Sequence, residues 1–493
     1  MISIQLTYHH KNYWKKQGHI SILGNIIIED KFLAIEKQFE YFQLIQNEST
    51  FLDAIKRADG HFSILLETSE YFFIAVDAIR TFPIFIKQKE NDIYICDHIV
   101  PNNDTLNIQA SADFEKIYCT QENDTLLNDW HQIRAGEYVV INKEQHTVQF
   151  KSYFKHSEKT SATNIKEAER KMIAYAIAYA NNRTILIPLS GGYDSRYLLA
   201  LLIENAYTKI ECFTYGKQDT FEVNTAKKVC EQLNIKWHFI EYTDELLQSF
   251  FSASWTDYSM INHHFTSLPH EQDFLALHYL KNKNALTKDA VVMNGFCQDL
   301  LAGSYLEPIN NFKLSDYVYE KYNVQIDKEK YDNTWLGFQD WFTKNRLSKF
   351  IINSVRVYEY FDLDFYLPFW SKDWVRFWNN KSYKERYRQA FYHQYLFDGL
   401  FKKYNIGFKK TAAEQRGRWY YFKKIGKNIL PDSFVKYIQL QNSKNRNKDV
   451  NNTLYLYNKI YEHVKDKPIE KDFRINNIHA RYFLQTLKNK FNL

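Results

Sequence analysis

The stretch that decides the fold is residues 184–204, TILIPLSGGYDSRYLLALLIE. Residues 185–189 form a short apolar run, which is typical of a strand buried on both faces. The run ends at the hexapeptide SGGYDS of residues 190–195, and residues 196–202 then predict a buried helix. A strand, a glycine-rich turn and a helix in this order point backbone N–H groups and a positive helix end at an anion.

The residue types inside the turn fit a phosphate ligand held through a metal ion. Gly191 and Gly192 can adopt positive φ and let phosphate oxygens approach the backbone. Ser190 and Ser195 add hydroxyl donors. Asp194 would repel a bare phosphate, so we expect a bridging Mg²⁺. The turn is not a Walker A loop, because no Gly-Lys-Ser/Thr follows it.

The hexapeptide resembles the SGGxDS pyrophosphate loop of the N-type ATP pyrophosphatases, which cleave ATP between the α- and β-phosphates and transfer AMP to a substrate oxygen. An ordinary glycine-rich turn is the alternative, but the full motif between a strand and a helix favours the functional interpretation. The resemblance implies ATP contacts from Leu189, Ser190, Gly191, Gly192, Asp194 and Ser195.

A second stretch, residues 290–305 (AVVMNGFCQDLLAGSY), again runs from an apolar strand into a turn that contains glycine and an acid. It resembles the asparagine synthetase pattern S/T-G-x-G-x-D-E-x-x-G-G-Y, with Gly295 as the first glycine, an expected ATP contact, and Asp299 as the acid. Asp194 and Asp299 are then expected to share one Mg²⁺, an ion that prefers carboxylate oxygens.

This second stretch also departs from the pattern that it resembles. Cys297 replaces the second glycine, and Phe296 stands where asparagine synthetases carry Glu and β-lactam synthetases carry Tyr. A phenyl ring can do neither acid–base nor hydrogen-bonding chemistry. Substrate handling must therefore differ from that of both enzymes, or the enzyme is impaired.

Between the two stretches, residues 210–216 and 236–240 predict strands and residues 221–233 a helix. This alternation predicts a parallel, doubly wound sheet, in which ligands lie at the carboxyl ends of the strands. Thr214 and Tyr215 lie at such an end, so we expect them to border the adenosine of ATP. Simple packing is an equally good interpretation of Tyr215.

The first third of the chain predicts a sheet sandwich covered by helices. Residues 47–58 predict a helix, and NKEQ (142–145) lies between two expected strands as a hairpin signal. The expected strands are residues 20–28, 61–66, 71–76, 85–86, 93–95, 138–141 and 147–150. Asp59-Gly60-His61-Phe62, Asp77 with Arg80 and Pro83, and Arg134-Ala135-Gly136 resemble "G-x-F-A", "D-x-x-G-x-x-P-L-Y" and "L-x-P-G" of the glutaminase domain that precedes the synthetase domain in asparagine synthetases.

A working glutaminase of this class needs a cysteine nucleophile at the mature N-terminus. The sequence instead opens Met1-Ile2-Ser3, and its first cysteine is Cys96. We therefore expect residues 1–155 to form a degenerate glutaminase-like domain, as in β-lactam synthetases, and residues 165–493 an asparagine synthetase-like ATP pyrophosphatase domain. The polar segment 155–164 is the expected linker, and Asn164 with Glu167 predicts a capping box at the next helix.

The predicted fold class is α/β: an N-terminal α+β sandwich, then a doubly wound parallel sheet, with a largely helical C-terminal part. Arg356 and Glu359 precede Pro368-Phe369 in a segment that resembles "E-x-R-x-P-F-L-D", with Tyr366 in place of its arginine. They are candidates for substrate-carboxylate binding and acid–base work; a surface salt bridge on a helix is the alternative. Lys409 and Lys410 lie where the family places a lysine that stabilises the charge of the adenylate, and a solvated lysine pair is the alternative.

Composition narrows the class of protein. A chain of 493 residues can form two or three domains, and a net charge of +6 gives no case for a nucleic-acid partner. No apolar run approaches the roughly 20 residues of a membrane span, and the opening residues lack a signal-peptide core, so we expect a cytoplasmic location. The five cysteines are scattered without a Cys-x-x-Cys pair, which argues against a disulfide framework, a zinc ribbon and a thiolating pyrophosphatase.

The expected function is that of an ATP- and Mg²⁺-dependent ligase without its own glutaminase activity. A carboxylate attacks the α-phosphate of ATP, and ammonia or an amine then displaces AMP to form an amide. The expected partners are a small carboxylate substrate and an ammonia or amine donor. Free ammonia, a separate glutaminase or an amine on the substrate itself are open as nitrogen sources. The alternatives are an impaired nucleotide-binding scaffold and another AMP-forming pyrophosphatase.

Overall fold

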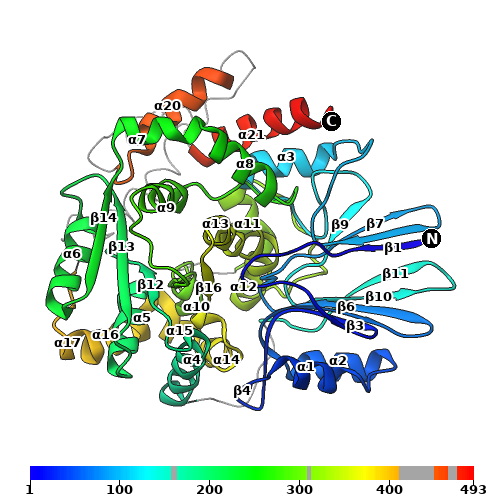
Figure 1. Cartoon of the computed structure of the whole chain (residues 1–493), viewed down its shortest axis with the longest axis horizontal. Coiled ribbons are helices and arrows are strands. Elements are labelled where there is room, and N and C mark those ends of the chain that lie inside the picture. The colour runs from blue at the N-terminus through cyan, green and yellow to red at the C-terminus, as the bar shows by residue number, and fades with distance from the viewer. Residues whose placement is uncertain (157–163, 308–311, 410–448, 465–474) are drawn as a thin grey trace.

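The computed structural model describes residues 1–156, 164–307, 312–409, 449–464 and 475–493. These residues form three sheets surrounded by helices (Figure 1). Two sheets belong to the first third of the chain, and the third sheet is parallel and begins at residue 185. The predicted fold class, a sandwich followed by a parallel sheet with helices, is confirmed.

The first two sheets are built from eleven strands. The larger has the order β11-β10-β6-β5-β3-β2, with β4 also paired to β3, and the smaller has the order β1-β8-β7-β9. The strands are β1 (Ile2–Gln5), β2 (Lys15–Gln17), β3 (Ile20–Ile28), β4 (Lys31–Phe32), β5 (Asp59–Glu67), β6 (Tyr71–Val76), β7 (Phe85–Lys89), β8 (Asp92–Cys96), β9 (Trp130–Gln132), β10 (Glu137–Asn142) and β11 (Thr147–Ser152).

Alternation along the strands divides this part into layers. In β6, Phe73 and Ala75 pack toward helices α1 (Ile35–Phe42) and α2 (Glu48–Arg57), while Phe72 and Ile74 pack into the core between the two sheets. This is the period of two expected of a strand with both faces covered. The predicted strands, the helix at 47–58 and the hairpin, whose register pairs Asn142 with Thr147, are confirmed. Strands β1, β2, β4 and β9 were not predicted; each has only two to four residues, too few for an apolar pattern to identify a strand.

The third sheet has the order β14-β13-β12-β15-β16, and every neighbouring pair is parallel. Its central strand is β12 (Ile185–Pro188), which leads into the SGGYDS motif. Helices α5, α6 and α9 pack against its strands. The other elements of this region are α4 (Ile165–Ala180), α5 (Tyr193–Glu204), β13 (Ile210–Gly216), α6 (Phe221–Leu233), β14 (Lys236–Glu241), α7 (Asp244–Gln248), α8 (Ala253–Asn262), α9 (Gln272–Asn282), β15 (Val291–Met293), α10 (Gln298–Ala302) and β16 (Asp364–Tyr366).

One capping detail differs from the prediction. Asn164 does cap α4, but its side chain accepts a hydrogen bond from the N–H of Lys166 rather than from that of Glu167. The reciprocal capping box with Glu167 is therefore absent at this described helix start, because the Asn164 oxygen is bonded one residue earlier than that motif requires.

The rest of the chain is helical in its described residues, as predicted. A π-helical segment, Thr343–Ile351, continues α12 without a break in the chain. The helices are α11 (Leu314–Tyr322), α12 (Trp335–Phe342), α13 (Arg356–Tyr360), α14 (Lys372–Asn379), α15 (Tyr383–Arg386), α16 (Ala390–Asp398), α17 (Leu400–Lys403), α20 (Thr453–Val464) and α21 (Ile475–Phe491). None of the helices in the described part of the chain is long and apolar enough to cross a membrane.

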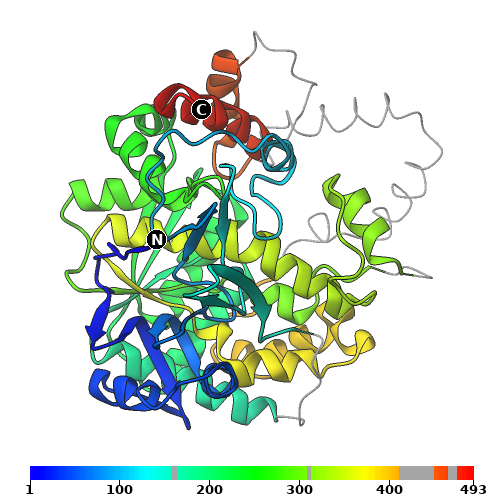
Figure 2. The ribbon, with the colours of Figure 1, turned by 90° about the vertical axis from the view of Figure 1, so that its right-hand side faces the viewer.

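The first third and the remainder of the chain share cores. Helix α3 (Ile108–Ile117) lies beside α21, almost at the other end of the sequence (Figure 2). Phe114 and Leu484 belong to one buried cluster, and a β-bridge joins Cys119 to Ser267. Leu23 and Ile27 of β3 belong to the largest core, together with the residues of the parallel sheet. The division at residues 155–165 stays a prediction, and these contacts fix how the two parts lie against each other.

Candidate functional site

The site begins where β12 ends, at residues 190–195, named here the pyrophosphate loop. The N–H of Gly192 donates to the Ser190 hydroxyl (3.1 Å), and the N–H of Ser190 donates to the Ser195 hydroxyl (3.2 Å). Gly191 has no room for a side chain, since a Cβ there would lie 2.5 Å from the Glu222 carboxylate. The two serines predicted as ligands therefore also shape the loop, and the glycine is required by a close neighbour.

Arg196 fixes the direction of the loop carbonyls. Its guanidinium donates to the carbonyl oxygens of Gly191 (2.8 Å) and Gly192 (2.9 Å). The same group donates to the carbonyls of Ile406 and Phe408, at 2.8 and 3.0 Å. A peptide whose carbonyl is held on one side presents its N–H on the other. Arg196 therefore braces the loop and joins it to the segment before Lys409.

Residues 294–299, named here the acidic loop, follow β15 and pack against the pyrophosphate loop. A Cβ on Gly295 would lie 2.8 Å from the Asp194 Cβ and 2.9 Å from the Ser195 nitrogen, so only glycine permits this approach. The N–H of Asp299 donates to the Asp194 carboxylate (3.2 Å). The structure thus brings Asp194 and Asp299 together, as the sequence predicted.

The two carboxylates influence each other's protonation. Desolvation and then the charge of Asp299 raise the pKa of Asp194 to about 8. Desolvation also raises the pKa of Asp299. Tyr392 of α16 donates to the second Asp194 oxygen (2.8 Å). Two desolvated, adjacent carboxylates repel each other when both are charged. A bound divalent cation stabilises the charged form of both.

These two acids suit Mg²⁺ better than a metal held by protein alone. Among the residues that the structure describes, no group of three or more His, Cys, Asp or Glu side chains could hold a metal ion. Mg²⁺ is commonly bound by one or two carboxylates, with the substrate phosphates completing its shell. Asp194 and Asp299 fit that donor set.

The predicted adenosine contacts are engaged in packing. Thr214 donates from its hydroxyl to the carbonyl of Leu189 (2.7 Å) and accepts from Trp237 (2.9 Å). Tyr215 donates to Asp273 (2.6 Å) and stacks on Tyr242, with ring centres 4.9 Å apart. Both residues lie at the carboxyl end of β13, beside the pyrophosphate loop, and the packing interpretation of Tyr215 is supported.

The candidates of the C-terminal half lie in two different places. Arg356 and Glu359 are buried and paired with each other, with the Arg356 Nε 3.1 Å from a Glu359 oxygen, and both contact the Tyr8 hydroxyl of the N-terminal part. The alternative of a surface salt bridge is therefore wrong, because this pair is enclosed where the two parts of the chain meet. Among the described residues, the hydrogen bonds and ion pairs of Arg356 and Glu359 do not reach the two loops.

Lys409 is exposed and follows Phe408, whose carbonyl Arg196 holds. Its ammonium lies 4.6 Å from the ring centre of Phe397. The Arg196 bond thus keeps the backbone before Lys409 at the pyrophosphate loop. Lys410 lies outside the described residues.

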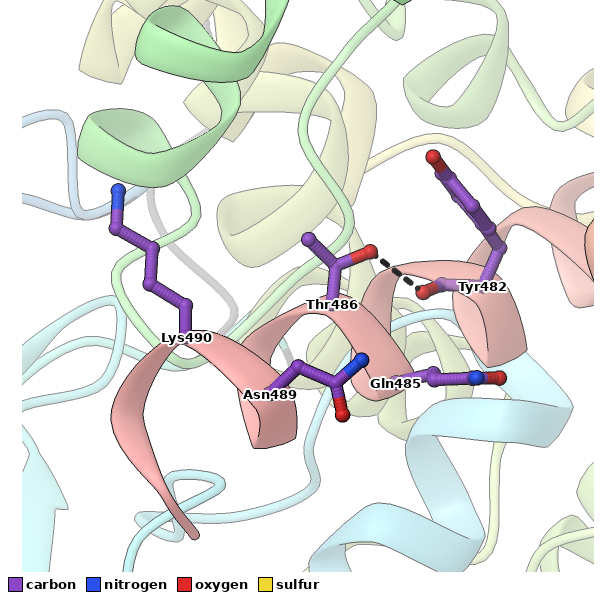
Figure 3. A pocket seen from close by; sticks show the side chains of 5 residues that line it. All are labelled: Tyr482, Gln485, Thr486, Asn489 and Lys490. Atoms are coloured by element: carbon purple, nitrogen blue, oxygen red, sulfur yellow. Dashed lines mark hydrogen bonds between the residues drawn. The ribbon is translucent and has the colours of Figure 1, made fainter.

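A cavity of about 250 Å³ adjoins the acidic loop through Phe296. The Phe296 carbonyl is held by the Trp370 indole N–H (3.1 Å). The lining combines apolar and aromatic side chains with imidazole, carboxylate, amide and hydroxyl groups; its residues are Leu268, Pro269, His270, Glu271, Gln272, Phe296, Phe350, Ile351, Ser354 and Asn476. Its position makes it the candidate substrate cavity. By contrast, a wider hollow of about 450 Å³ is lined by residues of α21 alone, and within it the Thr486 hydroxyl donates to the Tyr482 carbonyl (Figure 3); the lining residues are Tyr482, Gln485, Thr486, Asn489 and Lys490.

Two residues of the site were missed from the sequence. Arg196 carried a signal, since it is the one charged residue between Asp194 and Glu204 in an otherwise apolar helix. Tyr392 carried none, because it reaches Asp194 from almost two hundred residues away.

Comparison with known proteins finds a family match over part of the chain. A family model described as "Queuosine biosynthesis protein QueC" matches residues 184–289, roughly a fifth of the chain, starting at β12 and its loop. The match supports the PP-loop ATP pyrophosphatase superfamily for this segment and does not single out asparagine synthetases. No curated protein matches significantly.

Similar solved structures are distant. A glutamine-dependent NAD⁺ synthetase from Acinetobacter baumannii with ADP shares 11% identity over 40% of this chain and 42% of its own, with a TM-score of 0.22. This chain therefore spans less than half of that relative. An NMN synthetase from Francisella tularensis shares 16% identity over 45% of this chain and 96% of its own (TM-score 0.22), and a B. subtilis glutamine phosphoribosylpyrophosphate amidotransferase shares 9% over 58% and 64% (TM-score 0.19).

Proposed function

We propose that this protein is an ATP-dependent amide-forming synthetase that adenylates a carboxylate and passes ammonia or an amine to it, releasing AMP and pyrophosphate. One observation carries the proposal: the pyrophosphate and acidic loops meet so closely that Asp194 and Asp299 are hydrogen bonded through the Asp299 N–H. The amino end of α5 and the two adjacent acids thus lie together where the two loops meet. That is the donor set that a nucleoside triphosphate with Mg²⁺ requires.

The residues of the chain have distinct roles in this proposal. The amino end of α5 and the Ser190 and Ser195 hydroxyls bind the β- and γ-phosphates, while Arg196 holds the carbonyls of Gly191 and Gly192 in place. Mg²⁺ held by Asp194 and Asp299 supplies charge neutralisation for the departing pyrophosphate. Lys409 is the candidate cation for charge that develops on the α-phosphate.

The cavity behind Phe296 is the proposed site of the carboxylate substrate. Phe296 and Phe350 line it with aromatic rings, and His270 offers it a polar contact. Because Phe296 cannot act as acid or base, the attacking amine must lose its proton to another group or to solvent. Holding the acid against the α-phosphate supplies much of the rate by orientation.

In this proposal, the N-terminal sheets do not supply ammonia by hydrolysing glutamine. The first thiol of the sequence, Cys96, is buried in β8, and burial raises its pKa to about 12. A thiol with such a pKa is a poor nucleophile at neutral pH. Hydrolysis of glutamine by the protein alone would contradict this part of the proposal.

The experiment that tests the proposal is pyrophosphate release from ATP and Mg²⁺ over a panel of carboxylic acids, with ammonia present. We expect release that depends on one class of acid and falls at least about a hundredfold in Asp194→Asn, since a metal ligand is lost. The matched control is Asp289→Asn, an exposed acid at the other end of β15. Equal rates in both variants would overturn the role of Asp194.

The family match favours a second candidate, another AMP-forming enzyme of the PP-loop superfamily. Acid-independent pyrophosphate release would support that candidate, and ATP binding without release would support a nucleotide-binding scaffold. Mass spectrometry of the products separates an amide from other adenylate products.

A further inference from the structure

A buried arginine, Arg80, lies where the N-terminal sheets meet the rest of the chain. The Arg80 side chain is 1% exposed, and none of its three guanidinium nitrogens has a hydrogen-bond partner in the described part of the chain. The guanidinium lies over the face of Phe85, with its carbon 5.6 Å from the ring centre. A guanidinium has five N–H donors, and a buried donor set without acceptors is costly.

Asp77, the acid whose charge acts on Arg80, does not satisfy the guanidinium. Both Asp77 oxygens accept backbone N–H groups instead, from Phe62 (3.0 Å), Ile79 (2.9 Å) and Thr81 (3.1 Å). Arg356, whose charge also acts on Arg80, is already paired with Glu359. The carboxylates of Asp77 and Glu359 thus already have partners. Among the described residues, the N–H donors of the Arg80 guanidinium therefore have no acceptor.

His264, from the other part of the chain, contacts the same ring, that of Phe85. It is 5% exposed, neither ring nitrogen has a partner among the described residues, and its ring stacks on Phe85 at 5.8 Å. The charges of Arg356 and Arg80 act on it, and with burial and His98 they lower its pKa well below the ordinary value. Arg80 and His264 thus offer donors on either side of the junction.

Both residues also have a backbone conformation that side chains other than glycine rarely adopt. Arg80 has φ +57° and His264 has φ +52°. Residues held in this region cost about 1–3 kcal/mol and occur mainly at functional sites. Around them the junction is tightly joined: Arg356 donates to the carbonyl of Thr81 (3.2 Å), and the N–H of Leu126 donates to the carbonyl of Phe265 (2.7 Å).

We infer that Arg80 and His264 bind a small oxyanion, a carboxylate or an inorganic phosphate, at this junction, separately from the ATP site. The planar guanidinium matches two oxygens of such an anion, and the neutral imidazole adds one N–H. The anion joins the N-terminal sheets to the loop after α8. The inference does not rest on the proposed function.

Thermal unfolding of the full chain in a HEPES buffer free of chloride and phosphate tests it. Sodium phosphate, sodium acetate and sodium chloride are titrated separately. We expect phosphate or acetate, according to which one the site takes, to raise the unfolding midpoint by about 2–3 °C at a hundredfold excess over its dissociation constant. Chloride, which cannot pair with the fork of the guanidinium, should leave the midpoint in place.

Two variants make the test specific. Arg80→Gly removes the guanidinium and suits the positive φ, so it should fold and lose the anion shift. Arg57→Gln, an exposed arginine of α2, is the matched control and should keep the shift. A shift that persists in Arg80→Gly comes from another site, such as the pyrophosphate loop, and overturns the inference.

A crystal soaked in selenate, a tetrahedral anion with an anomalous signal, gives the direct readout. A peak between Arg80 and His264 that is missing in Arg80→Gly supports the site. No midpoint shift with any anion, together with no peak at Arg80, overturns it, and then water alone satisfies the guanidinium.

Discussion

Cys297 lies in the acidic loop with φ +59°, a left-handed conformation. The resembled sequence pattern has glycine there, so the loop has kept its shape while the residue changed. A residue with a side chain is strained by about 1–2 kcal/mol in this conformation. Glycine removes that strain, but its unfolded chain has more conformational entropy, which offsets part of the gain. We therefore expect Cys297→Gly to raise the free energy of unfolding by about 0.5–1 kcal/mol. Denaturant midpoints measure the gain, and Cys297→Ala, which keeps the strain, should show none.

Asp194 gives a pH prediction at the same scale. Its pKa is about 8 in the folded chain against an ordinary value of 3.8. Between these values the folded state holds a proton that the unfolded state has lost, so rising pH favours unfolding. Without Mg²⁺, we expect Asp194→Asn to be more stable than the native protein at pH 8 and similar to it near pH 4. Unfolding midpoints across this range measure the difference. An equal pH dependence in both proteins would contradict the raised pKa.

The residues found from sequence were those carried by a short contiguous motif. Asp194, Asp299 and Gly295 meet because parallel strands end at one edge of a sheet, which the pattern predicts. The roles of Arg356 and Glu359 could not be predicted, because their partner Tyr8 lies some 350 residues away. Arg80 could not be recognised as an anion-binding residue either, since only the packed structure shows that its guanidinium has no acceptor among the described residues.

At the scale of elements, the conformation of the pyrophosphate loop depends on hydrogen bonds from Arg196 of helix α5. Arg196 holds four carbonyls, two of the loop and two before Lys409. Lysine has a single nitrogen and cannot reach all four. We expect Arg196→Lys to weaken ATP binding at least about tenfold, since bonds to a charged group are worth about 1.5–3 kcal/mol each. Calorimetric titration with ATP and Mg²⁺ measures it.

The control for this prediction is Arg170→Lys, an exposed arginine of α4. Unchanged ATP affinity in Arg196→Lys would show that the loop keeps its conformation without the hydrogen bonds of Arg196.

Regular elements such as α6 and β13 were predicted to the residue, because their apolar periodicity and end signals are local. Strand β16 was not, since its three residues become a strand only by pairing with β15.

At the scale of the whole molecule, the Arg356–Glu359 pair lies at the junction of the two parts. Burial raises the pKa of Glu359 to about 7, and Arg356 opposes that rise. Removing one partner of a buried pair costs about 3–5 kcal/mol, whereas replacing both by apolar residues is often neutral. We expect Arg356→Met to be strongly destabilised and the double variant Arg356→Met, Glu359→Leu to recover. Adenylation by the folded double variant separates a structural role from a catalytic one: if only pyrophosphate release is lost, the pair is catalytic.

The junction also predicts how the chain unfolds. Leu23 and Ile27 of the first sheet belong to the same core as the parallel sheet, and α21 packs on α3. A fragment of residues 164–493 would expose these apolar faces together with the buried Arg356 and Glu359. We expect it to be insoluble alone and to be rescued by co-expression with residues 1–156, because apolar burial at the junction drives their association. Size-exclusion chromatography and circular dichroism of the fragments measure this. A soluble, monomeric fragment that unfolds cooperatively would show that the synthetase half needs none of these contacts, and the first third would then be a separable domain and not part of the core.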